Sequence, residues 1–240
     1  MPPRLKRTVS APLKLQHPTS IALVGETPEN IQRDCLGLFE LTKEKANGKS
    51  VYALVGCEQG MLWYAGGWIV GNREDLGSKM GGLWSPDGSL RPEAVSAKWK
   101  VAGEKTWTEA KGVSVIHGAE LESELTSAAQ TVSVVGATPS NLQRSFVGVF
   151  DKLPQRINGC PAYKLKEADT VLMYKQGSFW WVGDLARQSR LRSCDGALKP
   201  ELIRAPWEVW DGQRKKWAVA PDLECVTKQQ IRQAVRASQL

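Results

Sequence analysis

The sequence contains few side chains that could perform acid–base chemistry. Histidine is the commonest general base near neutral pH, and the chain has two, His17 near its start and His117 near its middle. Glu93 and Glu201 each follow a proline in similar surroundings and could act as general acids or bases. An acid beside proline in the first turn of a short helix also complements the helix dipole, and we favour this structural role.

The residues that usually bind nucleotides or metals form no recognisable motif. Segment 71–79 resembles a phosphate-binding loop only superficially, because Ser78 precedes Lys79, whereas a nucleotide-binding loop has lysine before serine or threonine. The cysteines form no Cys-x-x-Cys pair, which argues against a zinc cluster and against a disulfide framework. They are Cys35, Cys57, Cys160, Cys194 and Cys225. We therefore predict no catalytic residue, no metal site and no cofactor, in a protein that is not an enzyme.

An internal repeat organises the rest of the chain. Residues 24–54 align with residues 135–165 at a constant offset of 111, and 13 of these 31 positions are identical. Further landmarks follow in the same order in both halves. They pair Leu62 and Tyr64 with Leu172 and Tyr174, Trp68 with Trp180, Pro92-Glu93 with Pro200-Glu201, Trp99 with Trp207, and Trp107 with Trp217. The chain is therefore predicted to contain two copies of one module.

Each copy has the sequence pattern of short strands joined by tight turns. Asn-Gly pairs at 47–48 and 158–159 favour turns between strands, because both residues tolerate positive φ. Thr-Pro pairs at 27–28 and 138–139 indicate a single helical turn. We predict a mainly β protein, with two tandem copies of a small antiparallel β-meander or partly open barrel and a short C-terminal helix. The predicted segments are a disordered basic arm (1–20), β module copy 1 (21–115), an acidic linker (116–130), β module copy 2 (131–225) and the helix (226–240).

The tryptophans divide into two groups by whether they recur in both copies. The pairs Trp68/Trp180, Trp99/Trp207 and Trp107/Trp217 recur, so we expect them to form the core of each module. Trp84, in a variable loop over residues 72–90, and Trp210 have no tryptophan counterpart and are candidate contacts for a partner or a sugar ring. A loop tryptophan that folds back over its own core is an equal alternative for Trp84.

The second copy replaces the glycine-rich loop with a segment rich in arginine. Residues 184–198 carry Arg187, Arg190 and Arg192, which would favour an acidic or phosphorylated partner, although a solvated charged loop is an equal alternative. Variable loops on a shared frame are where binding residues often lie. A polar set shared by the copies could line a groove, but we favour a role in satisfying backbone groups. It consists of Asn30, Gln32 and Arg33 with Asn141, Gln143 and Arg144.

The net charge of +7 comes from the two ends of the chain. Residues 1–25 contribute +4 and residues 226–240 contribute +3, whereas residues 26–225 carry 25 basic and 25 acidic side chains. Nucleic-acid binding is therefore not expected, except through the basic tails. No apolar run is long enough to cross a bilayer. The N-terminal arm lacks the apolar region of a secretory signal, so we expect an intracellular, cytoplasmic protein, with organelle targeting by the arm as the alternative.

The order of motifs in each copy resembles a known kind of repeat. The motifs are Asn-Gly-x-x-x-Tyr, Trp-x-x-Gly, Pro-Glu-x-[Val/Ile], Trp-x-Val and a final Trp. This order is similar to the tandem tryptophan/glycine-rich β repeats that occur in predicted proteins of single-celled algae and other protists. The resemblance covers residues 21–115 and 131–225. It implies a multi-copy β module with no assigned activity.

These observations favour a non-enzymatic tandem binding or scaffold module. We expect a protein partner, of acidic character, to contact the variable loops 72–90 and 184–198. Linking two weak binding sites raises the avidity of the whole chain, which is a physical reason for a duplicated binder. A carbohydrate-binding module that takes a glycan on its tryptophans is the first alternative. An uncharacterised enzyme that uses carboxylates is the second.

Overall fold

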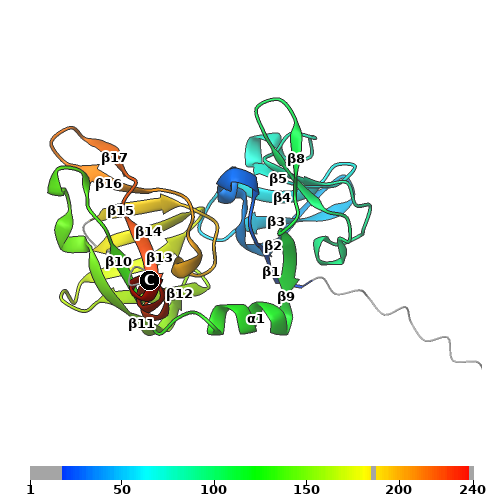
Figure 1. Cartoon of the computed structure of the whole chain (residues 1–240). Helices are drawn as coiled ribbons and strands as arrows, with labels where there is room; N and C mark the ends of the chain where they lie inside the picture. The colour runs from blue at the N-terminus through cyan, green and yellow to red at the C-terminus, as the bar shows by residue number, and fades with distance from the viewer. Residues whose placement is uncertain (1–17, 185–187, 238–240) are drawn as a thin grey trace, which may run out of the picture.

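The protein consists of two antiparallel β sheets in tandem, each with nine strands and each curled into a half-barrel (Figure 1). The structure, a computed structural model, describes residues 18–184 and 188–237. We refer to residues 20–117 as module 1 and to residues 131–227 as module 2. This architecture confirms the predicted mainly β fold with two copies and a short C-terminal helix.

In module 1 successive strands pair with one another, and the last strand returns to pair with the first. The strands are β1 (Ser20–Val24), β2 (Gly37–Ala46), β3 (Lys49–Leu54), β4 (Gly60–Tyr64), β5 (Trp68–Asn72), β6 (Leu83–Ser85), β7 (Trp99–Ala102), β8 (Trp107–Ala110) and β9 (Ser114–His117). Short 3₁₀ turns interrupt them at η1 (Pro28–Asn30), η2 (Arg33–Cys35), η3 (Arg73–Asp75) and η4 (Pro92–Ala94). The sheet order is β8-β7-β6-β5-β4-β3-β2-β1-β9.

Module 2 repeats this order as β17-β16-β15-β14-β13-β12-β11-β10-β18. Its strands are β10 (Thr131–Val135), β11 (Gly148–Ile157), β12 (Cys160–Leu165), β13 (Val171–Gln176), β14 (Phe179–Asp184), β15 (Gln188–Cys194), β16 (Trp207–Asp211), β17 (Lys216–Ala220) and β18 (Glu224–Thr227). Its 3₁₀ turns are η5 (Pro139–Asn141), η6 (Arg144–Phe146) and η7 (Pro200–Leu202). The identical strand order shows that one architecture was built twice.

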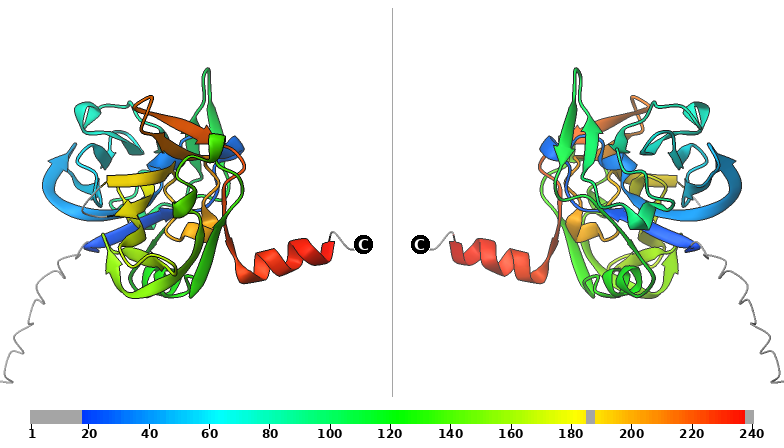
Figure 2. Two further views of the ribbon diagram at one scale, coloured as in Figure 1. Left: turned by 90° about the vertical axis from the view of Figure 1, so that its left-hand side faces the viewer. Right: turned by 90° about the vertical axis from the view of Figure 1, so that its right-hand side faces the viewer.

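One α helix follows the last strand of each module. Helix α1 (Gly118–Thr126) lies in the segment predicted as a linker, whose first two residues belong to β9. Helix α2 (Lys228–Ala237) occupies the same place after β18 and projects away from the rest of the molecule in Figure 2. No helix within residues 18–184 and 188–237 is long and apolar enough to cross a membrane.

The turns form where the sequence predicts them. Asn47 and Gly48 join β2 to β3 with φ values of 49° and 80°, and Asn158 and Gly159 do the same in module 2 with 50° and 74°. These left-handed conformations suit asparagine and glycine better than other residues. The Thr-Pro pairs open η1 and η5, and the Pro-Glu pairs open η4 and η7.

The concave face of each sheet forms the main core of its module. Trp68 and Trp99 are buried in module 1, and Trp180 and Trp207 are buried in module 2, as predicted. The third recurring pair, Trp107 and Trp217, was also predicted to lie in the core, but neither residue does. Trp107 is 39% exposed and pairs across the strands with Ala102, the outward neighbour of buried Val101, so strand alternation turns it to the outer face.

The hydrogen bonds of the two turns correct one step of the repeat alignment. The Asn47 side-chain amide donates to the Tyr64 carbonyl at 2.8 Å, and the Asn158 amide donates to the Lys175 carbonyl at 2.8 Å. Lys175 is therefore the structural counterpart of Tyr64, and not Tyr174 as the sequence alignment predicted. The predicted pairing of Leu62 with Leu172 is likewise wrong by one residue. A shift of one residue in a strand moves a side chain to the other face.

The variable segment predicted as a loop over residues 184–198 is largely a strand. β15 spans Gln188–Cys194 and pairs with both β14 and β16. The sequence of β15 hides the alternation of a half-buried strand, because the polar Ser193 is buried like Leu191, while Arg192 between them is half-buried. In module 1 the segment 72–90 contains η3 and the shorter strand β6.

Candidate functional site

The carboxylates considered for acid–base chemistry lie inside the modules. The Glu93 side chain is 4% exposed, and its Oε1 lies 3.1 Å from Arg91 Nε. Glu201 is buried and accepts a hydrogen bond from the Ala129 backbone N–H at 2.9 Å. Each glutamate occupies the first turn of its 3₁₀ helix. Among the residues that the structure describes, no group of three or more His, Cys, Asp or Glu is placed to hold a metal ion.

Aromatic side chains gather on the outer face of module 2. Phe179 and Trp181 come from β14, Trp210 from β16 and Trp217 from β17, and all are half-buried. The Trp217 ring makes edge contacts with Trp181 and Trp210, with ring centroids 5.8 and 5.5 Å apart. Such edge-to-face contacts between aromatic rings are favourable beyond the area they bury. We refer to these four residues together with Arg192 of β15 as the aromatic face.

Arg192 lies at the centre of the aromatic face. Its guanidinium carbon is 4.2 Å from the centre of the Trp217 ring and 5.1 Å from that of Phe179. Its Nε donates to Glu208 Oε2 at 2.6 Å. The ion pair and the cation–π contacts hold the guanidinium against the rings. The guanidinium is therefore fixed within the aromatic face.

Chain length explains why this face is uncovered in module 2. In module 1 the residues between β5 and β6, 73–82, fold over the outer face, and Trp63 beneath them is fully buried and donates to the Ser78 carbonyl at 2.8 Å. In module 2 the connection between β14 and β15 is residues 185–187 alone. The covering segment of module 1 therefore has no counterpart of similar length in module 2.

Module 1 has a pair of aromatic residues on β6 and β8, the counterparts of β15 and β17. The rings of Trp84 and Trp107 lie 5.7 Å apart at an interplanar angle of 62°, and Lys100 Nζ lies 5.3 Å from the Trp84 ring. The two tryptophans line a cleft of about 220 Å³ together with Ile69 and Lys79. The outer face of module 1 thus offers a tryptophan-lined cleft, where module 2 offers a broader surface.

The structure brings together some of the residues singled out from the sequence. Arg192 and Trp210 meet around Trp217, while Trp84 lies in the other module beside Trp107. Arg190 is half-buried on the outer side of β15, and Arg187 lies outside the described residues. Sequence reasoning missed Trp181 and Trp217 as surface residues. One signal could have identified the outer face of β16. Residues alternate between the two faces of a strand, so with Trp207 and Val209 in the core, Glu208 and Trp210 lie on the outer face.

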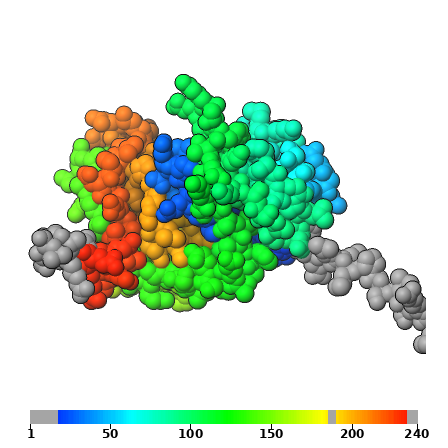
Figure 3. Space-filling model, turned by 45° about the vertical axis from the view of Figure 1, so that its right-hand side comes forward, coloured from blue at the N-terminus to red at the C-terminus, as the bar shows by residue number. Residues whose placement is uncertain are grey.

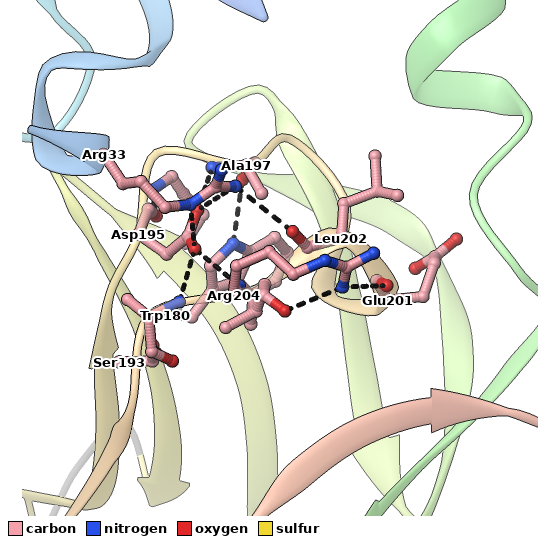
Figure 4. A network of polar contacts seen from close by, with 11 residues as sticks. Arg33, Trp180, Ser193, Asp195, Ala197, Glu201, Leu202 and Arg204 are labelled. Atoms are coloured by element: carbon pink, nitrogen blue, oxygen red, sulfur yellow. Dashed lines mark hydrogen bonds and ion pairs between the residues drawn. The ribbon is translucent and has the colours of Figure 1, made fainter. Parts of the chain in front are cut away.

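A second region of interest is the junction where the two modules meet. Figure 3 shows the first residues of module 1, in blue, against the orange segment of module 2, with green residues beneath both. At the centre of the junction the fully buried Asp195 carboxylate accepts three backbone N–H groups, from Ala197 at 2.8 Å, Arg204 at 2.7 Å and Ala205 at 3.0 Å. These bonds hold the loop after β15 in one conformation (Figure 4).

Arg33 of module 1 completes this arrangement (Figure 4). Its Nε and Nη2 donate to the two Asp195 oxygens at 2.6 and 2.9 Å, and Nη2 also donates to the Leu202 carbonyl at 3.2 Å. Burial pushes the pKa of the Asp195 carboxyl upward, but the hydrogen bonds from Arg33 and from the backbone outweigh it and hold that pKa below its usual value. Both charges are buried, so each depends on the other.

A lysine closes the loop in each module, but from a different strand. In module 2 the buried Lys175 ammonium on β13 donates to the Asp195 carbonyl, and burial lowers the pKa of this lysine to about 8. In module 1 the matching position is Tyr64, and Lys49 on β3 reaches over the Tyr64 ring to donate to the Gly88 and Ser89 carbonyls at 3.0 and 2.6 Å. The two copies therefore bind different carbonyls of the same loop with lysines from different strands.

Backbone contacts and an apolar cluster extend the junction. Gly196 N–H donates to the Arg33 carbonyl at 2.9 Å, and Gly177 N–H donates to the Val55 carbonyl at 3.1 Å. A cluster of buried apolar residues from both modules and from α1 lies next to them. It contains Ala22, Leu38, Ile116, Leu121, Leu125, Cys160 and Leu198. Helix α1 links the two modules along the chain. It also packs between them, because it contributes Leu121 and Leu125 to this cluster.

A cleft of about 330 Å³ opens beside the ion pair. Its walls include Leu36, Ile116 and Leu202, with Glu120 and Glu124 of α1 at one side. The polar groups that Arg33 and the loop contribute to this region are mostly engaged in the junction itself. The cleft therefore belongs to the packing of the modules.

No known protein-family model matches the chain, and searches of curated proteins and of solved structures find no significant match.

The junction predicts different effects for two equivalent glycines. A Cβ at Gly196 would lie 2.2 Å from the Leu36 carbonyl oxygen, whereas a Cβ at Gly88, its counterpart in module 1, would meet nothing within 4 Å. We expect Gly196→Ala to lower the free energy of unfolding by roughly 1–3 kcal/mol through overpacking. Gly88→Ala should change it by less than about 0.5 kcal/mol. Chemical denaturation of both variants tests this, and equal effects would contradict the close approach at the junction.

Proposed function

We propose that the chain is a non-catalytic binding protein, and that the aromatic face of module 2 takes a segment of a protein partner. One observation carries this proposal. Trp181, Trp210 and Trp217 remain partly exposed around Arg192, which is held by its ion pair and ring contacts. Tryptophan and arginine are the residue types that contribute most to binding energy at protein interfaces.

The chemistry of the face suggests what the partner segment contains. The rings offer apolar surface, and Val219 beside them is 55% exposed. Arg192 is partly neutralised by Glu208, and Arg214 lies 3.8 Å from Asp211, but the exposed Lys216 adds positive charge on β17. A segment with apolar residues next to carboxylates would therefore match the face better than a purely acidic one. This retains the expectation of a partner of acidic character and moves its contact from the loops to the strands.

A random-peptide display library tests the proposal directly. We expect selection on the full chain to enrich peptides in which carboxylates flank apolar residues. Trp217→Ala should weaken binding of the selected peptides at least about tenfold, because it removes the ring that contacts both its neighbours and Arg192.

Trp107→Ala is the matched control, because Trp107 occupies the same position in module 1. Binding of the selected peptides should survive this change. If the peptides bound Trp217→Ala as tightly as the unaltered chain, or if none were enriched, the aromatic face would not be a binding site.

A carbohydrate-binding role is the second candidate, and the cleft between Trp84 and Trp107 is the observation that favours it. Aromatic rings that line a cleft can pack against the apolar face of a sugar ring. Module 1 is the place to look for it, because Lys79 and Lys100 add hydrogen-bond donors there.

A glycan array tests the second candidate. The full chain should retain a defined set of glycans, and Trp84→Ala should abolish their retention by removing one wall of the cleft. Trp210→Ala on the outer face of module 2 is the control and should leave retention unchanged. An array on which the full chain retains no glycan would end this proposal.

A further inference from the structure

Both halves of the junction occur a second time in the chain. Arg33 of module 1 corresponds to Arg144 of module 2, and Asp195 of module 2 corresponds to Asp87 of module 1. The junction pairs Arg33 of module 1 with Asp195 of module 2 and leaves Arg144 and Asp87 outside it. Within the described residues Arg144 makes a hydrogen bond to the Gly136 carbonyl of its own module, and its partner is not a carboxylate. One arginine segment and one aspartate loop are thus left over.

The unused aspartate loop is already folded for the contact. Asp87 accepts backbone N–H groups from Ser89 at 2.8 Å, Ser96 at 2.8 Å and Ala97 at 3.0 Å. These are the equivalents of the three N–H groups that hold Asp195. The backbone N–H groups of Ser96 and Ala97 hold the pKa of the Asp87 carboxyl well below its ordinary value. A charged carboxylate is therefore presented in the same cradle.

The residues that form the junction are buried, whereas their counterparts in the other module are exposed or half-buried. In segment 33–38 every residue but one is buried, whereas in its counterpart 144–149 none is buried. Residues 195–198 are all buried, whereas in their counterpart 87–90 none is buried. Apolar residues are left in the open as a result. Leu90 is 69% exposed where its counterpart Leu198 is 2% exposed, and Val149 is 39% exposed where Leu38 is 6% exposed.

The glycine of the contact is retained as well. Gly196 must be glycine because a Cβ at this position would lie 2.2 Å from the Leu36 carbonyl oxygen. Gly88 is under no such demand inside its own module, since its φ is not positive and a Cβ would meet nothing. A glycine at that place leaves room for another backbone to approach.

We propose that a second copy of this chain docks its segment 144–149 onto the loop 87–90 of the first, and that this contact repeats the junction between the modules. Arg144 would then leave the Gly136 carbonyl and pair with Asp87 of the next copy. Val149 would cover Leu90, and the backbone around Val147 would approach Gly88. The two surfaces differ, so the contact is head-to-tail and leads to a row of chains or to a closed ring.

The contact between copies should be weaker than the contact within the chain. Helix α1 strengthens the junction with ion pairs from Glu122 to Arg156 at 2.6 Å and from Glu124 to Lys199 at 2.8 Å. Helix α2, its counterpart, carries Arg232 and Ala234 at the matching positions. The apolar positions Leu121 and Leu125 are kept as Ile231 and Val235, and Ile231 is 39% exposed. We therefore expect a reversible assembly that depends on concentration. It uses a surface separate from the aromatic face and does not depend on the proposed function.

Sedimentation velocity of the full chain tests the assembly. Over a series from roughly 10 μM to about 1 mM, the range in which weak contacts become populated, the average mass should rise from that of one chain, 26.4 kDa, to about twofold or more. Gly88→Gln should abolish the rise by filling the space that the partner backbone needs. Arg144→Glu should abolish it by placing two acids together.

Each variant has a control of matched chemistry on an exposed turn. Gly212→Gln and Lys105→Glu should assemble like the unaltered chain. Thermal unfolding of all four variants checks that the fold is retained, which we expect because the altered positions are exposed.

A mixture distinguishes a head-to-tail contact from other modes of association. Gly88→Gln keeps an intact arginine segment, and Arg144→Glu keeps an intact aspartate loop. An equimolar mixture of the two folded variants should therefore form a complex that stops at two chains, although neither variant associates alone. A constant mass of the unaltered chain at every concentration would overturn the proposal. So would variants that assemble like their controls, or a mixture that stays monomeric.

Discussion

The buried ion pair between Arg33 and Asp195 is the constraint on which the arrangement of the modules depends. A buried carboxylate is costly unless its hydrogen-bonding capacity is filled, and Asp195 is filled by three backbone N–H groups and a two-point contact from Arg33. The pairing is specific in direction, because a guanidinium and a carboxylate in this geometry tolerate little rotation. The loop that carries Asp195 and the turn that carries Arg33 are therefore fixed together, and the apolar cluster around Leu38 and Leu198 packs in the register that they set.

Duplication followed by local change explains most of the differences between the modules. The strand order, the concave core and the aspartate loop are common to both copies. The lysine that binds the loop carbonyls comes from β3 in one copy and from β13 in the other, so its function was kept while its position moved. The outer faces have diverged more, because nothing in the core constrains them. A covering segment closes most of the face in module 1, and its absence leaves the tryptophans around Arg192 accessible in module 2.

Much of the fold follows from local sequence, and the functional surfaces follow from it less. The Asn-Gly turns and the buried Trp68 and Trp99 were predictable, because turn chemistry and repeated apolar landmarks act over short distances. Trp107 was misplaced because recurrence of a tryptophan does not say which face of a strand it occupies. β15 was taken for a loop because the buried Ser193 puts a polar residue on the core face and interrupts the expected alternation of apolar and polar residues. Arg33 could not be paired with Asp195 by any local rule, since the two are 162 positions apart.

Calorimetric unfolding of Arg33→Met, compared with Arg144→Met, tests the central claim most directly. The two arginines occupy equivalent positions, but Arg33 is buried at the junction and Arg144 is exposed. We predict one cooperative transition for the unaltered chain and for Arg144→Met. Arg33→Met leaves the Asp195 charge buried without its partner, which typically costs about 3–5 kcal/mol, and should separate the unfolding of the modules into two transitions. A single transition of Arg33→Met at the midpoint of the unaltered chain would show that the ion pair does not hold the modules together.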